Sequence, residues 1–491
     1  MHQKVDEFLQ LVDFFYFETL AWATASKAKQ TCRSYDMNEK NYSEITPYIR
    51  KLAKLSNESN AIHADMYVEH DVKRGLRDLN GKGVVAGLTE VSNIKAKNTD
   101  ANGNEIPCEG ELYYRGVNIK DITQGFLSED RHGFEESIFL LLFSKLPTRQ
   151  ELADFKAVLS EYRSLPPSFV RDMILKAPGK NMMNILSRSV LALYAYDENP
   201  DDISIENVLR QSLQLIAQFP LLSAYGYQSY QHYHNDKSLF IHYPKSEYDT
   251  AENLLYVLRE HGEFTPLEAK VLDLALVLHA EHGGGNNSSF TTHVVTSSGT
   301  DTYAAISAAL GSLKGPRHGG ANVKVVEMFD DMKASVNVKD KGQIKDYLVK
   351  LLDKQAFDQA GLVYGIGHAV YSKSDPRADI LHQSAKLLSR EKGMEEEFEL
   401  YETVADLAPQ LIAEKRKMYK GVSVNVDFYS GLVYKMLNLP HEIYTPIFAI
   451  ARIAGWSAHR IEELQNAGKI IRPAYINVKQ TVAYEKISDR K

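Results

Sequence analysis

The sequence predicts an almost entirely α-helical protein. From Phe134 onward, apolar residues recur at intervals of three and four, which is the spacing of one face of a helix. Proline or short polar stretches separate the segments with this pattern, which include Glu135–Phe143, Arg149–Leu159 and Asn207–Gln218. Pro266–His279 is apolar on nearly every side, a pattern typical of a helix buried in a large core.

Strands are expected in one region of the chain. Between Gly81 and Asn104, glycine, asparagine and β-branched residues replace helix-forming ones, and short strands are predicted around Val84–Val85 and at Leu112–Tyr114. The N-terminus differs, because its apolar residues lie on one helical face and acidic residues interrupt them. This pattern predicts an N-terminal helical extension over residues 1–42.

Composition excludes several classes of function. The chain has 491 residues, 44% of them hydrophobic and 25% charged, which is enough for one large folded domain and a smaller one. Its formal net charge of −7 provides no positive field for a nucleic acid or an acidic membrane surface, so neither is an expected partner. No apolar stretch approaches the length of about 18 residues that a membrane-spanning helix needs, which predicts a soluble protein.

The cysteines indicate the compartment. Cys32 and Cys108 alone supply neither a disulfide framework nor a zinc site built from cysteine. A reducing environment, and hence a cytoplasmic location, is expected.

Three segments place histidines beside glycines: Leu278–Asn286, Leu313–Asn322 and Gly365–Tyr371. In the first, His282 precedes three glycines and is better placed to face a ligand than His279, which we interpret as a core residue. The pair resembles a metal site, but it lacks the four-residue spacing of the HExxH helix and a complete ligand set, so no metal is predicted.

The second and third segments hold one histidine each. His318 lies between Gly315-Pro316 and Gly319-Gly320, and because glycine has no Cβ a ligand can approach this backbone closely. The residue spacing of a phosphate-binding P-loop is absent. His368 follows Gly367, and Arg377 lies nine positions later, able to present a two-pronged donor to a carboxylate. The alternative is that Asp375-Pro376 only starts a helix and that Arg377 is incidental.

Two charged residues farther along the chain have similar alternatives. Asp427 either caps a helix that begins at Phe428 or supplies a functional carboxylate. Arg452 lies within an apolar helical segment, where a guanidinium is costly to bury unless it meets an anion.

In this order, the motifs resemble the citrate synthase family, which includes the 2-methylcitrate synthases. The resemblance runs from Val72–Leu76 through Gly87–Thr89 and Glu111–Gly116 to Arg472-Pro473. It implies an all-α fold with a large helical domain and a smaller helical lid domain. The large domain is expected over residues 43–319 and 439–491 and the small domain over residues 320–438, with closure of the small domain assembling the site.

The resemblance also assigns the catalytic roles. It makes His318, His368 and Asp427 the catalytic residues. Asp427 removes a proton from the methyl group of the acyl-CoA, a neutral His318 stabilises the enolate oxygen, and His368 polarises the oxaloacetate carbonyl.

The substrate contacts follow from the same resemblance. It implies that His282, Arg377, Arg452 and Arg472 bind oxaloacetate, with Phe448 as an aromatic wall. In the family, the arginine that corresponds to Arg472 comes from the neighbouring subunit, so a homodimer is expected.

The resemblance assigns contacts to CoA as well, to the backbone of Leu362, Val363, Tyr364, Gly365, Ile366 and Gly367. Many family members have a basic residue four places after the third histidine, where this chain has Ser372, and Lys373 is expected to substitute for it. Arg74 and Arg317 are alternative contacts for the CoA phosphates.

The expected function is therefore an acyltransferase of the tricarboxylic acid cycle that condenses acetyl-CoA with oxaloacetate and needs no cofactor. One alternative is a 2-methylcitrate synthase or an enzyme with both activities, because one methylene changes the binding free energy by only about 1–3 kcal/mol. The remaining alternatives are a non-catalytic CoA-binding homologue and a metal hydrolase built on His279 and His282.

Overall fold

The computed structural model describes residues 43–59, 62–78, 82–368, 370–416, 421–466 and 468–490. The chain forms two compact units, Met1–Val85 and Ala86–Lys491, and each is described by itself. The helical extension predicted over residues 1–42 lies outside the described residues. The predicted boundaries of a small domain at residues 320 and 438 stay a prediction.

The described residues of the first unit form two short helices, α2 (Pro47–Ser59) and α3 (Ala64–Glu69), and a 3-10 turn. The strand predicted around Val84–Val85 is wrong. A single antiparallel bridge joins Arg77 to Gly83, and Val85 is exposed. Two strands of this length bury too little apolar surface to extend the pairing further.

The second unit begins with a three-stranded antiparallel sheet in the order β1-β2-β3, formed by β1 (Ser92–Thr99), β2 (Glu105–Tyr114) and β3 (Val117–Asn118). This confirms the strand predicted at Leu112–Tyr114. Ser92 pairs with Tyr114 at one end of the sheet. The Tyr114 hydroxyl donates to the carbonyl of Val277, 2.9 Å away, so the sheet is attached to the buried helix predicted from the sequence.

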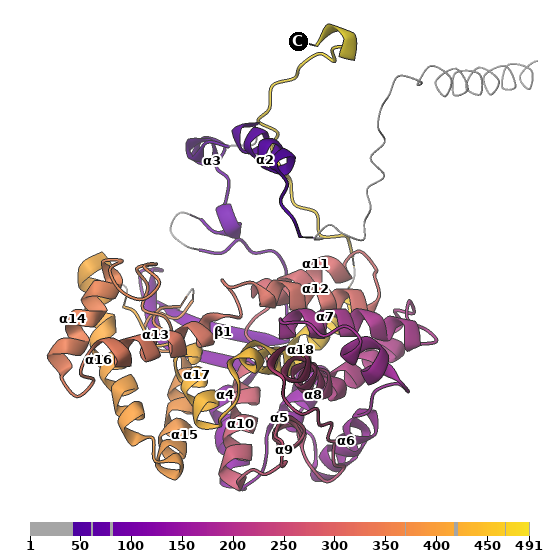
Figure 1. Ribbon diagram of the computed structural model, residues 1–491, viewed down its shortest axis with the longest axis vertical. Coiled ribbons are helices and arrows are strands. Elements are labelled where there is room, and N and C mark those ends of the chain that lie inside the picture. Colours follow the sequence, from indigo (N-terminus) through magenta and orange to yellow (C-terminus); the bar gives the residue numbers. More distant parts are fainter. Residues whose placement is uncertain are drawn as a thin grey trace, which may run out of the picture. The chain divides into compact units, whose positions relative to one another are not determined.

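Helices make up most of the rest of this unit, which confirms the predicted all-α class (Figure 1). They are α4 (Ile119–Ser128), α5 (Phe134–Phe143), α6 (Arg149–Tyr162), α7 (Met182–Leu193), α8 (Ile205–Asn235), α9 (Thr250–Leu258), α10 (Pro266–His279), α11 (Asn287–Thr296), α12 (Thr302–Lys314), α13 (Ala321–Ser335), α14 (Lys341–Leu352), α15 (Pro376–Lys392), α16 (Glu395–Arg416), α17 (Val426–Met436) and α18 (His441–Gln465). Among the described residues, none of these helices is both long and apolar enough to cross a bilayer.

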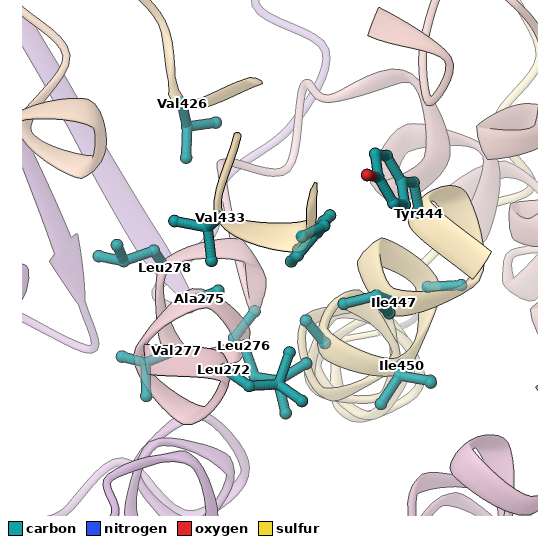
Figure 2. Packing of buried hydrophobic residues seen from close by; sticks show 14 of the residues in the cluster. Leu272, Ala275, Leu276, Val277, Leu278, Val426, Val433, Tyr444, Ile447 and Ile450 are labelled. Atoms are coloured by element: carbon teal, nitrogen blue, oxygen red, sulfur yellow. The ribbon is translucent and has the colours of Figure 1, made fainter. Parts of the chain in front are cut away.

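Helix α10 is buried along its length and occupies the predicted residues. Thr265 and Glu268 form a reciprocal capping box at its start, and Pro266 takes the first helical position. Figure 2 shows Leu272 and Leu276 of α10 packed near side chains of α17 and α18. His279 is the last residue of this buried helix, so its ring lies at the C-terminal end of α10 within the core.

Helix α18 passes very close to the end of α10 at Gly455. A Cβ atom at this position would lie 2.6 Å from the carbonyl oxygen of Ala280 and closer still to Oε2 of Glu281. Real Cβ atoms do not approach a backbone oxygen this closely, so the glycine allows the two helices to meet.

We expect Gly455→Ala to lower the free energy of unfolding by about 1–3 kcal/mol, the usual effect of overpacking, as measured by urea denaturation. Alanine favours a helix over glycine by about 1 kcal/mol, so propensity alone predicts the opposite sign. Gly125→Ala in α4 is the matched control, because a Cβ there meets no atom within 4 Å. Stabilisation by both substitutions would show that the contact at Gly455 is not tight.

Candidate active site

Side chains from three parts of the chain meet around Phe448 of α18. Its ring contacts the ring of His279 edge-on, with centroids 4.7 Å apart, and the ring of His318 at 6.3 Å. The guanidinium carbon of Arg452 lies 4.7 Å from the centroid of the same ring. The structure thus brings together residues from the end of α10, the segment before α13 and the middle of α18.

A second set of contacts connects His282 to the segment before α15. The ring of His282 lies 5.2 Å from that of His368 and 5.6 Å from that of Tyr371, measured between centroids. Five residues singled out in the sequence therefore form one site with His279: His282, His318, His368, Phe448 and Arg452.

Arg452 is a fully buried cation whose charge is not matched by a carboxylate. Its relative exposure is 0%, and its Nε donates to the carbonyl of His279 at 2.7 Å. The two terminal nitrogens have no hydrogen-bond partner, and no carboxylate of the described residues lies within 4.0 Å of them. Removing such a charge from water costs several kcal/mol, so the arrangement is suited to a ligand that brings a carboxylate.

The two histidines at the end of α10 have open ring nitrogens as well. Neither nitrogen of His279 has a partner among the described residues, and the same holds for Nε2 of His282. Burial, with the nearby charge of Arg377, lowers the pKa of both rings well below the ordinary value of 6.5, so both are neutral. His279 is fully buried, as expected of a core residue, but its ring nitrogens are not satisfied. The sequence signal for a histidine open to a ligand was its position at the end of a buried helix, shortly before a run of glycines.

Arg377 is held by its neighbour Asp375. Asp375 accepts from Nε and Nη2 of Arg377 at 3.0 and 2.7 Å, and it also caps the start of α15 through the backbone N–H of Arg377. It accepts from the backbone N–H of Val426 in addition, at 3.3 Å. The capping role weighed from the sequence is confirmed, and the same carboxylate also fixes the guanidinium in a buried position beside the start of α17.

Asp427 is not the cap of α17. Asn425 takes that position, and its side chain accepts from the backbone N–H of Asp427 at 3.0 Å. Burial and nearby charges, and no hydrogen bond from the described residues, determine the pKa shift of the Asp427 side chain. Burial raises the pKa of Asp427 to about 6, while the charge of Arg377 opposes the increase. A carboxylate with this pKa is a stronger base than an exposed one.

His368 has a defined tautomer. Its Nδ1 accepts from the backbone N–H groups of Val370 and Tyr371, at 3.0 and 3.1 Å. A nitrogen that accepts hydrogen bonds carries a lone pair, so in the neutral ring the proton is on Nε2. His368 can therefore donate a hydrogen bond from Nε2.

His318 is also neutral. Burial, followed by the charge of Arg452, lowers the pKa of His318 to about 4. Its Nε2 lies 3.1 Å from Oγ of Ser288, a hydroxyl that also accepts from the indole N–H of Trp456. Ser288 therefore orients the ring of His318. The sequence did not point to Ser288, because a serine in the first turn of a helix is common and indicates no catalytic role.

The predicted CoA loop is attached to the segment before α17. The backbone N–H of Asn425 donates to the carbonyl of Gly365, and that of Gly367 donates to the carbonyl of Ser423, at 2.9 and 2.7 Å. Gly365 has a φ of +79°, and a Cβ there would lie 2.9 Å from Cα of Phe428. The loop therefore depends on glycine, and its position is coupled to that of Asp427. Val363 is buried, Leu362 is exposed, and the hydroxyl of Tyr364 donates to Asp358.

Three cationic candidates lie outside this cluster. Arg472 is exposed on the extended segment after α18, and Lys373 and Arg317 are exposed as well. A fourth candidate, Arg74, belongs to the first unit, where it stacks on Tyr67.

Comparison with known proteins gives consistent matches over most of the chain. Residues 78–474 match the family profile described as citrate synthase, C-terminal domain. The chain is 35% identical to a citrate synthase of Synechocystis over 397 residues, which are 80% of this chain and 90% of that protein. It is 31% identical to 2-methylcitrate synthase 2 of Corynebacterium glutamicum, over 82% of this chain and 94% of that protein. The fold is similar to a citrate synthase structure from Pyrobaculum aerophilum, with a TM-score of 0.68, 26% identity and coverage of 84% and 95%.

We expect Asp427→Asn to stabilise the folded protein above pH 6. Because folding raises the pKa of Asp427 from 3.8 to about 6, stability falls as the pH rises through this interval. The penalty reaches at most about 3 kcal/mol above pH 6, and an isosteric amide removes it.

Urea denaturation of variant and wild type at pH 8 and near pH 4 measures the effect, and the difference should shrink at the lower pH. Asp375→Asn is the contrasting control and should destabilise the protein, since it loses the ion pair with Arg377. An Asp427 variant less stable than the wild type at pH 8 would contradict the proposed penalty.

Proposed function

Because the chain belongs to the citrate synthase family, we propose that it condenses acetyl-CoA with oxaloacetate and hydrolyses the resulting thioester to citrate and CoA. The observation that carries the proposal is the fully buried Arg452, whose two open terminal nitrogens lie beside the unpartnered nitrogens of His279 and His282. Two neighbouring groups, His318 and Asp427, have pKa values suited to proton transfer at the methyl carbon of an acyl thioester.

Oxaloacetate is a dicarboxylate, and its binding would satisfy these open groups. A carboxylate facing Arg452 can accept two parallel hydrogen bonds, a geometry that also fixes its orientation. Arg377 adds a second buried positive charge, and Asp375 limits its movement. The neutral rings at the end of α10 then donate without adding charge to the pocket.

The chemical steps follow from three side chains. Asp427 removes a proton from the acetyl methyl group, and its raised pKa brings the base closer to the weak carbon acid in strength. A neutral His318 donates to the thioester oxygen, where negative charge develops. The enol carbon attacks the oxaloacetate ketone while His368 donates from Nε2 to its oxygen and gives up that proton to the alkoxide.

CoA would occupy the side of the site formed by residues 362–367. The backbone of this loop is fixed to residues 423–425, so that bound CoA and the base Asp427 share one support. Lys373 is exposed near the end of this segment and can contact a phosphate. The acyl-CoA is a substrate here, and the proposed reaction needs no separate cofactor.

Citrate formation of this kind belongs to the tricarboxylic acid cycle, and we propose a cytoplasmic location because Cys108 is free and the sequence offers no disulfide framework. The related 2-methylcitrate synthase of Corynebacterium glutamicum, at 31% identity, supports propionyl-CoA as a second candidate substrate. The two acyl groups differ by one methylene, so use of both is compatible with the same site.

A thiol-release assay with oxaloacetate separates these substrates. We expect release from acetyl-CoA and a preference over propionyl-CoA in kcat/KM of no more than about 200-fold, because a single methylene contributes about 1–3 kcal/mol. Release that depends on propionyl-CoA alone would assign the second candidate. No thiol from either substrate would exclude both, and omission of oxaloacetate controls for simple thioester hydrolysis.

We further propose a homodimer in which Arg472 completes the oxaloacetate site of the neighbouring subunit. Within one chain this arginine is exposed on an extended segment, and it makes no hydrogen bond or ion pair to the described residues. A symmetric dimer offers every subunit the same exchange.

Mixed dimers test the exchange. Arg472→Gln and Asp427→Asn should each lose most activity at low oxaloacetate, but mixing and refolding them together should restore about a quarter of wild-type activity, since half of the dimers would contain one intact site. If Arg472 acts within its own chain, no mixed site is intact and no activity returns.

A further inference from the structure

A pair of histidines lies outside the catalytic groups, between α11 and α18. His293 of α11 and His459 of α18 face each other, with Nε2 of the first 3.1 Å from Nδ1 of the second. His459 is fully buried, whereas His293 has a relative side-chain exposure of 12%. The proposed reaction uses neither residue.

Carboxylates hold the outer nitrogen of each ring. Glu463 accepts from Nδ1 of His293 at 2.8 Å, and Glu281 accepts from Nε2 of His459 at 3.0 Å. A carboxylate can only accept, so both outer nitrogens carry hydrogen. Although burial opposes it, the carboxylates of Glu281 and Glu462 raise the pKa of His459 to about 9, so without a metal ion its Nδ1 carries a proton that it donates to His293 Nε2. A divalent ion would replace this proton and bind both inner nitrogens.

Glu462 supplies a third candidate ligand atom, an oxygen, near the two nitrogens. Its Oε1 accepts from the backbone N–H of Glu90 at 2.7 Å, while its Oε2 lies 3.8 Å from Nδ1 of His459. That Oε2 atom has no hydrogen-bond partner among the described residues. The three candidate ligand atoms of His293, His459 and Glu462 all lie within 4.8 Å of one another.

The separation of the two inner nitrogens is close to that in a tetrahedral zinc site. Zn–N bonds of about 2.0–2.1 Å at the tetrahedral angle place two nitrogens about 3.3 Å apart, and the observed separation is only a few tenths of an ångström smaller. Histidine ligands almost always donate their other N–H to a carboxylate or carbonyl, as both rings do here.

The remaining side of the pair faces Gly284. A Cβ at this glycine would lie 3.5 Å from Nε2 of His293 and 3.4 Å from Cε1 of His459. Because glycine has only a hydrogen atom in place of the Cβ, there is space beside the two rings. Three protein ligands and one water are a common coordination for zinc.

We propose that His293 Nε2, His459 Nδ1 and Glu462 Oε2 bind a divalent transition-metal ion of the zinc class. The ion joins α11 to α18. It also supports the loop that carries His282, because Glu281 accepts from Ser92 Oγ at 2.9 Å and Ser92 accepts from the backbone N–H of Gly283 at 3.1 Å. The ion takes no part in the proposed reaction, and the inference does not depend on which acyl-CoA the protein uses.

Equilibrium dialysis and Co²⁺ spectroscopy on the full chain test this site. After treatment with a chelator, the wild type should bind one equivalent of Zn²⁺ per chain, and Co²⁺ should produce the visible absorption of a tetrahedral site. Glu463→Gln should weaken binding by about 10–100-fold as an outer partner, and His293→Gln should weaken it further as a ligand. In thermal unfolding, Zn²⁺ should stabilise the wild type but not His293→Gln.

His132→Gln is the matched control. His132, Asp249 and Glu252 form the other described group with ligand atoms within 4.8 Å, so this variant should keep the Co²⁺ spectrum. The inference is overturned if the wild type binds no Zn²⁺, as when the two rings only share a proton. It is overturned equally if His132→Gln, rather than His293→Gln, abolishes binding.

Discussion

The buried guanidinium of Arg452 is the constraint on which the candidate active site depends. It lies between α10 and α18 with one backbone acceptor, the carbonyl of His279, and two terminal nitrogens without a partner. A protein supports such a charge only when the surrounding core is stable and when the open nitrogens serve a ligand. The apolar sides of α10 supply that core, and the glycine at 455 lets α18 approach closely enough to place the guanidinium.

The same charge sets the protonation of its neighbours. Together with burial, it lowers the pKa of His318, so that this ring stays neutral and can donate without adding positive charge. The pKa of Asp427 shifts upward instead, because burial raises it more than the charges of the arginines lower it. A neutral donor beside a strengthened carboxylate is the combination needed to form an enol from a weak carbon acid. The raised pKa that makes Asp427 a good base also makes its ionised form a source of instability.

The segment from His279 to Gly285 faces the catalytic groups with its histidines and contacts Ser92 and His459 through Glu281. His279 and His282 open toward the catalytic groups, whereas Glu281 accepts from His459 and from Ser92. The proposed metal ion lies beyond that carboxylate. Its binding would therefore restrain the loop that bears His282 without entering the reaction itself. This separation explains how one short segment can contain two histidines, a carboxylate and three glycines, each with a different environment.

The sequence by itself determined the helical class, the bounds of α10 and the histidines, arginines and aspartate that form the site. It did so because helical periodicity and helix capping are local, and α10 begins and ends at the residues that these signals indicate. Local signals misjudged Val84–Val85, where strand formation requires partners that the described residues do not provide. The capping role considered for Asp427 was a local misreading, because Asn425, two residues earlier, takes that position. Only the tertiary structure decided that His279 lacks a partner and that His293 meets His459. Both facts depend on burial or on contacts between distant segments, such as the 166 residues that separate the two facing histidines.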